Sequence, residues 1–437
     1  MKKYTVIGMA RSGIAAAYKL KELGYKPYLS EYKVAEDILD AEKLRQDFDC
    51  EFGGHTDKVL DSDLIIVSPG IPDIPILRKA KEQNIEIISE IEFGYRIKHP
   101  NSKIIAITGS NGKSTTVSLI HHLLITAGYN SVLAGNIGTA FTSYPIEKPE
   151  IDFIVLELSS FQLELIDRFK PDVAAILNIT PDHLNRYAGF DDYAKTKFNI
   201  FQNLSENELA IINADDETTK KFIPLINGNL KQFSTNNEAD IFVQNNEIVF
   251  ANHKFNIDEI KIKGPHNIAN ALAALLAVSP FNIPNEDLRK GLATFVSLPH
   301  RLEYVDTIAG VKFINDSKAT NTDSVKYALQ SFDRPIRIIM GGKGKGEDYR
   351  ILNKYLSKFA KKIYLIGETI AEMRAAFSGV CEFEEFDSFK AAIVKAFEDA
   401  KSGEDVVLSP ACTSYDMFAN FEVRGDTFKE IVRELKK

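Results

Sequence analysis

The sequence predicts an α/β protein with three domains: a Rossmann-like N-terminal domain, a central P-loop ATPase-like domain with a small antiparallel sheet, and a C-terminal Rossmann-like domain. Three observations support this. A chain of 437 residues is too long for a single domain with one ordinary hydrophobic core, so about three domains are expected. Short apolar strands alternate with helix patterns along the chain. Glycine-rich or polar motifs follow several strands, where doubly wound sheets bind ligands. We expect boundaries at 1–93, 94–297 and 298–437.

The composition is that of an ordinary globular protein and excludes several function classes. A net charge of −8 argues against a nucleic-acid-binding surface. The three cysteines, Cys50, Cys381 and Cys412, are widely spaced, which excludes a disulfide framework and a cysteine zinc site and suits a reducing cytoplasm. Because no apolar run reaches about 18 residues, we expect a cytoplasmic protein that does not bind a membrane.

The first domain begins with a strand over 4–8, a glycine turn and a helix over 14–23, followed by strands over 27–30 and 64–67. This is a Rossmann-like half-fold. Glu31 lies about 20 residues past the glycines, where an NAD-binding fold has its ribose-binding acid. However, Ala10 replaces the middle glycine, and the domain is short for two nucleotide-binding halves. A nucleotide-sugar diphosphate is therefore favoured over NAD or a purely structural turn.

The most informative motif lies in the central domain. An apolar strand over 104–107 runs into Thr108-Gly109-Ser110-Asn111-Gly112-Lys113-Ser114, here called the phosphate loop, and a helix pattern follows. Backbone N–H groups at a helix N-terminus attract phosphate. Lys113 can reach the outer phosphates, and the Ser114 hydroxyl is placed to bind Mg²⁺. Ile107 stands where the general P-loop pattern has glycine, so the strand and helix context supports the interpretation.

Further polar residues follow strands of the central domain. Glu157 ends the apolar run 153–156, which is the place of a Walker-B-type metal ligand; the alternative is a solvated acid. His183 follows the predicted strand 173–177 at the same ligand edge, although a lone histidine is usually a surface or packing residue. His121 and His122 lie within the helix after the phosphate loop, and we interpret both as structural.

Other segments of the central domain leave alternatives open. The glycines of the loop 134–138 indicate that the backbone of this loop passes close to another group of the protein or a ligand. Residues 239–263 predict a small antiparallel meander. Asn267 and Asn270 begin a buried helix and could bind a base or cap the helix. Lys195 and Lys197 lie in a predicted helix over 193–201, where either would usually be a solvated lysine.

The C-terminal domain repeats the strand–loop pattern. Strands predicted over 312–315, 337–340, 362–366 and 406–408 end in polar or glycine-rich segments. These segments begin at Asp316, Gly341, Gly367 and Ser409. The pattern predicts a second doubly wound sheet with a ligand edge.

Together these motifs resemble the Mur ligase superfamily over the whole chain. The motifs that carry the resemblance are 108–114, Glu157, His183, 266–270 and Arg301. Four more specific motifs, 68–71, 299–303, 315–321 and 409–412, resemble those members that join D-glutamate to UDP-N-acetylmuramoyl-L-alanine. The family often has an acidic residue in the Gly-Gly-x-Gly-Lys-Gly loop, where this chain has Lys343.

The resemblance implies an ATP-dependent amide ligase of peptidoglycan precursor synthesis. The sugar-linked carboxylate would attack the γ-phosphate of ATP to give an acyl phosphate and ADP, and the amine of D-glutamate would then displace phosphate. Two anions meet in the first step, so the protein must supply positive charge and alignment. The resemblance further implies two Mg²⁺ ions, a carbamylated Lys197 and a monomer. Lys197 is preferred over Lys195 because it has the Tyr-x-x-x-Lys spacing from Tyr193.

The resemblance also implies the site residues. The catalytic residues would be Lys113, Glu157, His183 and Lys197, and the metal ligands Ser114, Glu157, His183 and Lys197. ATP would be bound by Gly109, Ser110, Asn111, Gly112, Lys113, Ser114, Thr115, Asn267, Asn270, Arg301 and Asp316. The UDP-sugar would be bound by Arg11, Ser12, Gly70, Asn136 and His183. D-Glutamate would be bound by Lys318, Thr320, Lys345, Ser414 and Phe421.

Two other function classes remain open from the sequence. A dehydrogenase that uses the N-terminal fold would leave the phosphate loop unexplained, and absence of NAD(H) binding would dispose of it. A P-loop switch or motor would have no use for a third domain with lysine-rich substrate loops. ATP turnover independent of any amino acid would favour it.

Overall fold

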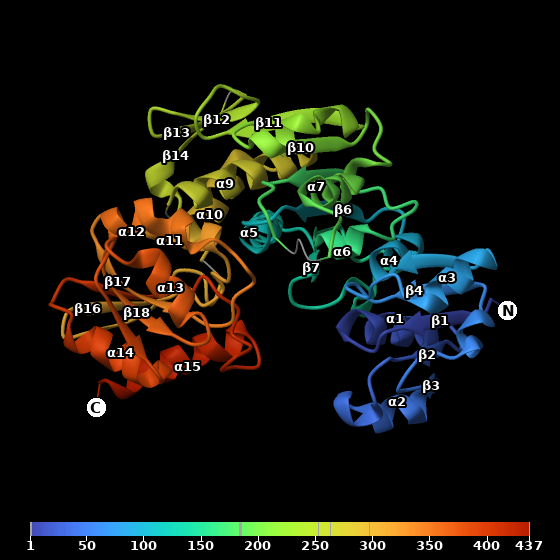
Figure 1. Cartoon of the computed structure of the whole chain (residues 1–437). Helices are drawn as coiled ribbons and strands as arrows, with labels where there is room; N and C mark the ends of the chain where they lie inside the picture. Colours follow the sequence, from blue (N-terminus) through green and yellow to red (C-terminus); the bar gives the residue numbers. More distant parts are fainter. Residues whose placement is uncertain (1, 183–185, 252, 263, 297, 437) are drawn as a thin grey trace. The chain divides into compact units, whose positions relative to one another are not determined.

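The computed structural model describes residues 2–182, 186–251, 253–262, 264–296 and 298–436 (Figure 1). Contacts divide the chain into two compact units, Met1–Glu259 with Ala269–Thr294, and Ile260–Ile268 with Phe295–Lys437. The first unit contains two sheets and the second contains one. The expected three-domain α/β architecture is confirmed, while the proposed domain boundaries stay a prediction.

The N-terminal sheet is fully parallel, with the order β3-β2-β1-β4-β5. Its strands are β1 (Tyr4–Ile7), β2 (Tyr28–Ser30), β3 (Asp49–Glu51), β4 (Leu64–Val67) and β5 (Glu86–Ser89). Its helices are α1 (Arg11–Glu22), η1 (Ala35–Asp37), α2 (Ala41–Asp47), η2 (Asp57–Leu60), α3 (Pro75–Glu82) and α4 (Glu90–Ile97). The strand order reverses between β1 and β4, and ligands bind at such switch points in open α/β sheets.

The tight turn between β1 and α1 requires glycine at position 13. A Cβ on Gly13 would lie only 1.9 Å from the carbonyl oxygen of Gly8. The neighbouring loop after β4 closes on the same turn, because the Ser68 hydroxyl donates to that carbonyl at 2.8 Å. Helix α1 begins at Arg11, earlier than the predicted start at Ile14, so Arg11 and Ser12 belong to its first turn.

The central sheet has nine strands in the order β14-β13-β12-β11-β10-β9-β6-β8-β7. The strands are β6 (Lys103–Thr108), β7 (Ser131–Gly135), β8 (Phe153–Glu157), β9 (Val173–Ile176), β10 (Leu209–Asn213), β11 (Asn229–Ser234), β12 (Ile241–Gln244), β13 (Glu247–Phe250) and β14 (His253–Asn256). Among the described residues, only the pairs β12–β13 and β13–β14 of this sheet are antiparallel. The predicted meander therefore exists, as an extension of the large parallel sheet.

The inner strands of this sheet follow directly from the sequence. Their apolar runs are buried on both faces, which is typical of a parallel sheet covered by helices. The surrounding helices are α5 (Lys113–Thr126), η3 (Phe141–Ser143), α6 (Ser160–Leu163), α7 (Phe190–Phe198), η4 (Asn199–Phe201), α8 (Glu217–Lys221), η5 (Ile223–Leu225), η6 (Ile257–Glu259), α9 (Pro265–Val278), η7 (Ser279–Phe281) and α10 (Asn285–Thr294). Helix α7 begins at Phe190, before the predicted start at Tyr193, because Asp191 and Asp192 favour a helix N-terminus.

The C-terminal sheet has the order β15-β16-β20-β17-β18-β19, and only β15–β16 is antiparallel. Its strands are β15 (Glu303–Ile308), β16 (Val311–Asn315), β17 (Ile336–Gly341), β18 (Ala360–Ile366), β19 (Phe383–Phe386) and β20 (Asp405–Leu408). Its helices are α11 (Thr322–Leu329), η8 (Tyr349–Leu352), α12 (Asn353–Phe359), α13 (Ile370–Phe377), α14 (Phe389–Glu398) and α15 (Phe421–Glu434). The four strands predicted for this domain are all present.

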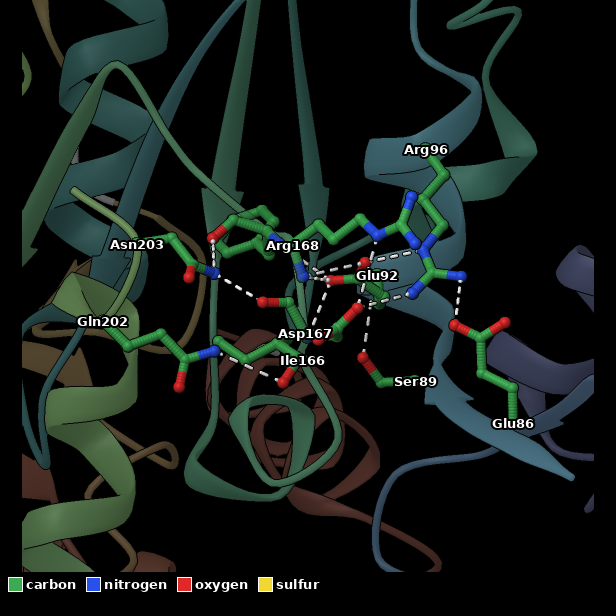
Figure 2. A network of polar contacts seen from close by, with 10 residues as sticks. Glu86, Ser89, Glu92, Arg96, Ile166, Asp167, Arg168, Gln202 and Asn203 are labelled. Carbon is green, nitrogen blue, oxygen red and sulfur yellow. Dashed lines mark hydrogen bonds and ion pairs between the residues drawn. The ribbon is translucent and has the colours of Figure 1, made fainter. Parts of the chain in front are cut away.

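A buried carboxylate joins α4 to the central domain (Figure 2). Glu92 accepts hydrogen bonds from the backbone N–H groups of Asp167, Arg168 and Phe169 at 2.8–3.1 Å. Arg96 donates to the same carboxylate at 2.7 Å. The Asn203 side-chain amide donates to the carbonyl oxygens of Asp167 and Phe169, so this segment is held from both sides.

No helix among the described residues is long and apolar enough to span a bilayer.

Candidate active site

The phosphate loop connects β6 to α5, as the motif predicts. Gly109 and Gly112 have φ values of +147° and +86°, which favour glycine. A Cβ on Gly112 would also lie 2.4 Å from Oδ1 of Asn270. Helix α5 begins at Lys113, so its N-terminus lies at the loop, and a helix N-terminus attracts anions such as phosphate. Lys113 Nζ donates to the carbonyl oxygens of Gly109 and Ser110, both at 2.9 Å.

The segment after β9 braces the phosphate loop. Asn178 accepts a hydrogen bond from the Asn111 N–H at 2.8 Å and donates to the Asn111 carbonyl at 3.0 Å. The Ser110 hydroxyl donates to the Thr180 carbonyl at 2.9 Å and lies 3.1 Å from the Tyr193 hydroxyl. The sequence alone does not identify Asn178 and Thr180 as supporting residues, because the pairing of β6 with β9 that brings them to the loop joins segments distant in sequence.

Glu157 and Ser114 provide oxygen atoms near this edge of the sheet. Glu157 ends β8 and pairs with Ile107 of β6, while Ser114 lies in the first turn of α5. Both side chains are buried. Asn136 Nδ2 donates to Glu157 Oε1 at 2.7 Å, which fixes the orientation of the carboxylate. A hydroxyl and a carboxylate are hard oxygen ligands and fit Mg²⁺.

Among the described residues, the oxygen atoms of Ser114 and Glu157 are not part of a dense ligand cage. Within the described ranges, no group of three or more His, Cys, Asp or Glu side chains could hold a metal ion. Mg²⁺ usually takes one or two carboxylates and completes its shell with water and substrate phosphates. The donor set of Ser114 and Glu157 therefore fits a nucleotide-associated Mg²⁺. His183 lies outside the described residues.

Lys197 of α7 contacts the phosphate loop, although it lies far from that loop in sequence. Its side chain is only 2% exposed, and its Nζ donates to the Gly109 carbonyl at 3.1 Å. The same Nζ lies 4.7 Å from the Tyr193 ring centroid. Burial, followed by the positive charge of Lys113, holds the pKa of Lys197 well below that of an ordinary lysine. Lys195 is exposed.

Two further predicted ATP residues lie beside the phosphate loop. Thr115 is buried in the first turn of α5. Asn270 of α9 accepts a hydrogen bond from the Thr116 hydroxyl at 3.2 Å, which holds α9 against α5. Asn267 is buried one turn earlier in α9, and its N–H donates to the Gly264 carbonyl at 3.0 Å.

Arg11 and Asn136, two of the residues predicted to bind the UDP-sugar, meet within the first unit. Arg11 donates through Nη1 to the Gly138 carbonyl at 2.6 Å and through Nη2 to the Asn136 carbonyl at 3.3 Å. Ser12 is buried in the same helical turn, and Gly70 has a φ of +89° after β4. By contrast, the Glu31 carboxylate accepts the Met9 N–H at 2.6 Å, so it supports the glycine turn itself.

Asp316 follows β16 at the ligand edge of the C-terminal sheet. The Leu302 N–H donates to its Oδ1 at 3.2 Å, and the Ser409 hydroxyl donates to its Oδ2 at 2.8 Å. Burial raises the pKa of Asp316 to about 7, although these hydrogen bonds and the charge of Arg301 favour the ionised form. His300 and Leu302, on either side of Arg301, have φ values of +63° and +44°, which is a strained backbone.

Several residues predicted to bind D-glutamate also lie together. Lys318 Nζ lies 4.5 Å from the Phe421 ring centroid, and the Thr320 N–H donates to the Lys318 carbonyl at 2.8 Å. Ser414 is buried in the segment after β20. Lys345 is exposed on the loop after β17. This arrangement gives a cation and an aromatic ring at the end of the sheet.

Arg424 of α15 supports this edge, a role that the sequence does not predict. Its guanidinium is fully buried and donates to the carbonyl oxygens of Ser317, Cys412 and Thr413 at 2.8–3.2 Å. An arginine in the amphipathic helix α15 looks like a surface residue, so the sequence has no signal for this role. The backbone of Lys343 exchanges two hydrogen bonds with Thr413, both at 3.0 Å.

Comparison with known proteins covers almost the whole chain. Family models match at residues 2–89 (Mur ligase MurD-like, N-terminal domain), 107–278 (Mur ligase middle domain) and 300–412 (Mur ligase, glutamate ligase domain). A UDP-N-acetylmuramoylalanine–D-glutamate ligase of Koribacter versatilis is 40% identical, covering 99% of this chain and 98% of that protein. The ligase of the same name from Caldicellulosiruptor bescii is 41% identical with the same coverage.

Solved structures show the same fold at lower identity. The UDP-N-acetylmuramate-alanine ligase MurC of Thermotoga maritima matches with a TM-score of 0.64 and 17% identity, covering 99% of this chain and 100% of that one. A MurF structure from Acinetobacter baumannii matches with a TM-score of 0.66 and 17% identity, covering 99% and 93%. From the family models and the full-length relatives, the chain belongs to the Mur ligase family.

Proposed function

We propose that this chain is an ATP-dependent ligase that adds D-glutamate to UDP-N-acetylmuramoyl-L-alanine, forming ADP and phosphate, in peptidoglycan precursor synthesis. The observation that carries the nucleotide chemistry is the meeting of Lys113 and Lys197 at the Gly109 carbonyl of the phosphate loop. The choice of substrates is supported by the names of full-length relatives that are 40% and 41% identical.

The first step joins two anions, the acceptor carboxylate and the γ-phosphate of ATP. A carboxylate oxygen attacks phosphorus, and the bond to the β-phosphate oxygen breaks to release ADP. Lys113 and the N–H groups at the start of α5 lie where they can offset the charge on the phosphates. In the second step, the amine of D-glutamate attacks the acyl carbon, and the bond from that carbon to the phosphate oxygen breaks. Inorganic phosphate leaves, and the nitrogen loses one proton to water as the amide forms.

Ser114 and Glu157 would hold one Mg²⁺ ion. His183 and Lys197, the latter as a carbamate, would hold a second ion. When bound, Mg²⁺ supplies positive charge and alignment for the transferring phosphoryl group. Asn136 holds Glu157 by a 2.7 Å hydrogen bond, so the carboxylate is oriented before the ion arrives.

Lys197 fits the chemistry of carbamylation. Its low pKa favours the neutral amine, whose nitrogen lone pair can attack the carbon of CO₂ and release one proton to water. The product is a carbamate, which places two oxygen atoms at the end of the lysine side chain. Those oxygens suit a hard divalent ion, whereas an ammonium group would repel it.

The ligand edge of the C-terminal sheet would bind D-glutamate. Lys318, above the Phe421 ring, and Lys345 would pair with its carboxylates, while Thr320 and Ser414 offer hydroxyl groups. At the N-terminal edge, Arg11, Ser12, Gly70 and Asn136 would bind the UDP-sugar, with Arg11 contacting the diphosphate.

The deciding experiment is phosphate release from ATP by the full-length protein. UDP-N-acetylmuramoyl-L-alanine is supplied as the acceptor, together with a panel of D- and L-amino acids. We expect turnover that requires both the acceptor and D-glutamate. Turnover with ATP alone would favour a P-loop switch, and turnover with a different amino acid would refute the proposed substrate.

A further inference from the structure

Residues 68–71, here called the UDP-sugar loop, follow β4 and contain Gly70, which is expected to bind the UDP-sugar. The loop packs on the glycine turn of its own domain, because Ser68 donates to the Gly8 carbonyl at 2.8 Å. A Cβ on Gly8 would lie 2.6 Å from Cδ1 of Ile71, so the other end of the loop is close to the same turn. The position of this loop relative to the phosphate loop depends on contacts that reach the central domain.

Arg186 of the central domain makes such a contact. It lies between β9 and α7 in the chain, and its Nη2 donates to the Ile71 carbonyl at 2.9 Å. Its side chain is only 20% exposed, so the hydrogen bond is partly shielded from water. The two residues are 115 positions apart in the sequence. Arg186 therefore ties the UDP-sugar loop to the central domain.

Glu164, directly after α6, holds the guanidinium of Arg186 in this position. Nη2 of Arg186 donates to Glu164 Oε2 at 2.7 Å, and Nε donates to Oε1 at 3.4 Å. A contact through two nitrogen atoms fixes the plane of the guanidinium as well as its distance. The Tyr187 hydroxyl donates to Oε1 of the same carboxylate at 3.0 Å, so Glu164 is itself held in place.

Aromatic rings continue this set of contacts to the phosphate loop. The Arg186 guanidinium carbon lies 5.8 Å from the Phe161 ring centroid, and the Tyr187 ring stacks on Phe161 with an angle of 9° between the planes. Tyr187 also contacts Tyr193, at 5.4 Å between ring centroids. The Tyr193 hydroxyl lies 3.1 Å from the Ser110 hydroxyl of the phosphate loop. Arg186 thus belongs to a packed group that extends from one proposed substrate loop to the other.

We propose that Arg186 is a positioning residue that fixes the UDP-sugar loop in its binding conformation and that Glu164 acts by holding Arg186. The inference rests on the proposed function, because residues 68–71 are taken to bind the UDP-sugar. A loop that is already ordered binds its ligand more tightly, because binding does not have to offset the cost of ordering it. Arg186 acts through Ile71 and touches no reacting atom in this scheme.

The test is isothermal titration of UDP-N-acetylmuramoyl-L-alanine into the full-length protein and its Arg186→Gln variant. Arg186→Gln should raise the Kd by about tenfold, because the loop loses a hydrogen bond from a charged donor. The Kd of ADP, titrated with Mg²⁺, should change by less than about twofold, because Asn178 still braces the phosphate loop. This difference between the two ligands is what a general loss of structure would not produce.

Further variants test the role of Glu164. Glu164→Gln removes the charge that holds Arg186 but keeps an oxygen for the Tyr187 hydroxyl, and it should raise the Kd of the UDP-sugar by about threefold. The double variant of Arg186→Gln and Glu164→Gln should stay near tenfold rather than reach the product of about thirtyfold, because both changes act through one contact. Arg168→Gln, the matched control, changes an arginine that is 72% exposed and should keep the Kd of the wild type.

The outcomes separate this inference from the proposed function. An unchanged Kd of the UDP-sugar in Arg186→Gln overturns the role of Arg186 alone, and so does an equal loss of ADP binding. An unchanged Kd in Glu164→Gln overturns the proposal even if Arg186→Gln does not fold, as does a double variant in which the two effects multiply. A wild type that does not bind the UDP-sugar overturns the proposed function, and the role of Arg186 with it.

Discussion

The amine nitrogen of Lys197 lies 3.1 Å from the carbonyl oxygen of Gly109, which brings a lysine of α7 onto the phosphate loop. The same carbonyl accepts a hydrogen bond from Lys113 at 2.9 Å. Burial, followed by the positive charge of Lys113, holds the pKa of Lys197 well below that of an ordinary lysine. The geometry therefore favours a neutral amine at position 197, which is the reactive form.

We expect Lys197→Ala to lose most activity, with the loss in kcat rather than in the KM for ATP. The proposed second Mg²⁺ ion would matter most where negative charge gathers in the transition state. Lys195→Ala, on the exposed face of the same helix, is the matched control and should stay active. A small added carboxylate should partly restore Lys197→Ala. A fully active Lys197→Ala enzyme would refute the role.

Replacing Lys113 tests the phosphate loop directly. Lys113→Ala should lower kcat by on the order of 10²-fold or more, because it removes a preorganised positive charge that stabilises the transferring phosphoryl group. Phosphate release at saturating ATP measures this loss, and circular dichroism should show an unchanged fold. An unaltered kcat would show that Lys113 of the phosphate loop does not take part in phosphoryl transfer.

Lys318 is expected to act on the amino acid rather than on ATP. Lys318→Ala should mainly raise the KM for D-glutamate, because it removes a partner of a substrate carboxylate. Lys312→Ala, an exposed lysine on β16, should leave both KM values unchanged. A change confined to the KM for ATP would contradict the assignment.

The sheets and the phosphate loop could be predicted because their signals are local. Apolar runs such as 104–107 are long enough to identify buried strands. Gly109 and Gly112 mark a turn that other residues cannot easily form. The ligand edges of the sheets could also be predicted, because polar residues that come after parallel strands gather at one side of a sheet.

The supporting contacts could not be predicted, because they join segments distant in sequence. Asn178 lies 67 residues from Asn111, and Glu92 lies 77 residues from Phe169. Arg424 looks like an exposed helix residue until the packing of α15 is known. The start of α1 at Arg11 was also missed, because Ala10 has no side-chain cap signal.

Glu92 should be important for stability. Glu92→Ala would leave the N–H groups of Asp167, Arg168 and Phe169 without their acceptor, and should lower the free energy of unfolding by about 2–4 kcal/mol. Glu206→Ala, at an exposed position, should change it by less than about 0.5 kcal/mol. Urea unfolding measures both, and equal stabilities would show that the network in Figure 2 contributes little.

The titration of Asp316 should make stability depend on pH. Its folded pKa of about 7 lies above the unfolded value of about 3.9, so the folded state binds the extra proton between these values. Stability from this group is therefore present at low pH and is lost as pH rises from about 4 to 7. Asp316→Asn removes this dependence. As the pH rises across that range, the free energy of unfolding of the wild type should fall relative to that of the variant by on the order of 1–4 kcal/mol. Asp333→Asn, at an exposed position, should follow the wild type. Urea unfolding at several pH values measures the difference, and parallel curves for Asp316→Asn and the wild type would show that folding does not raise the pKa of Asp316.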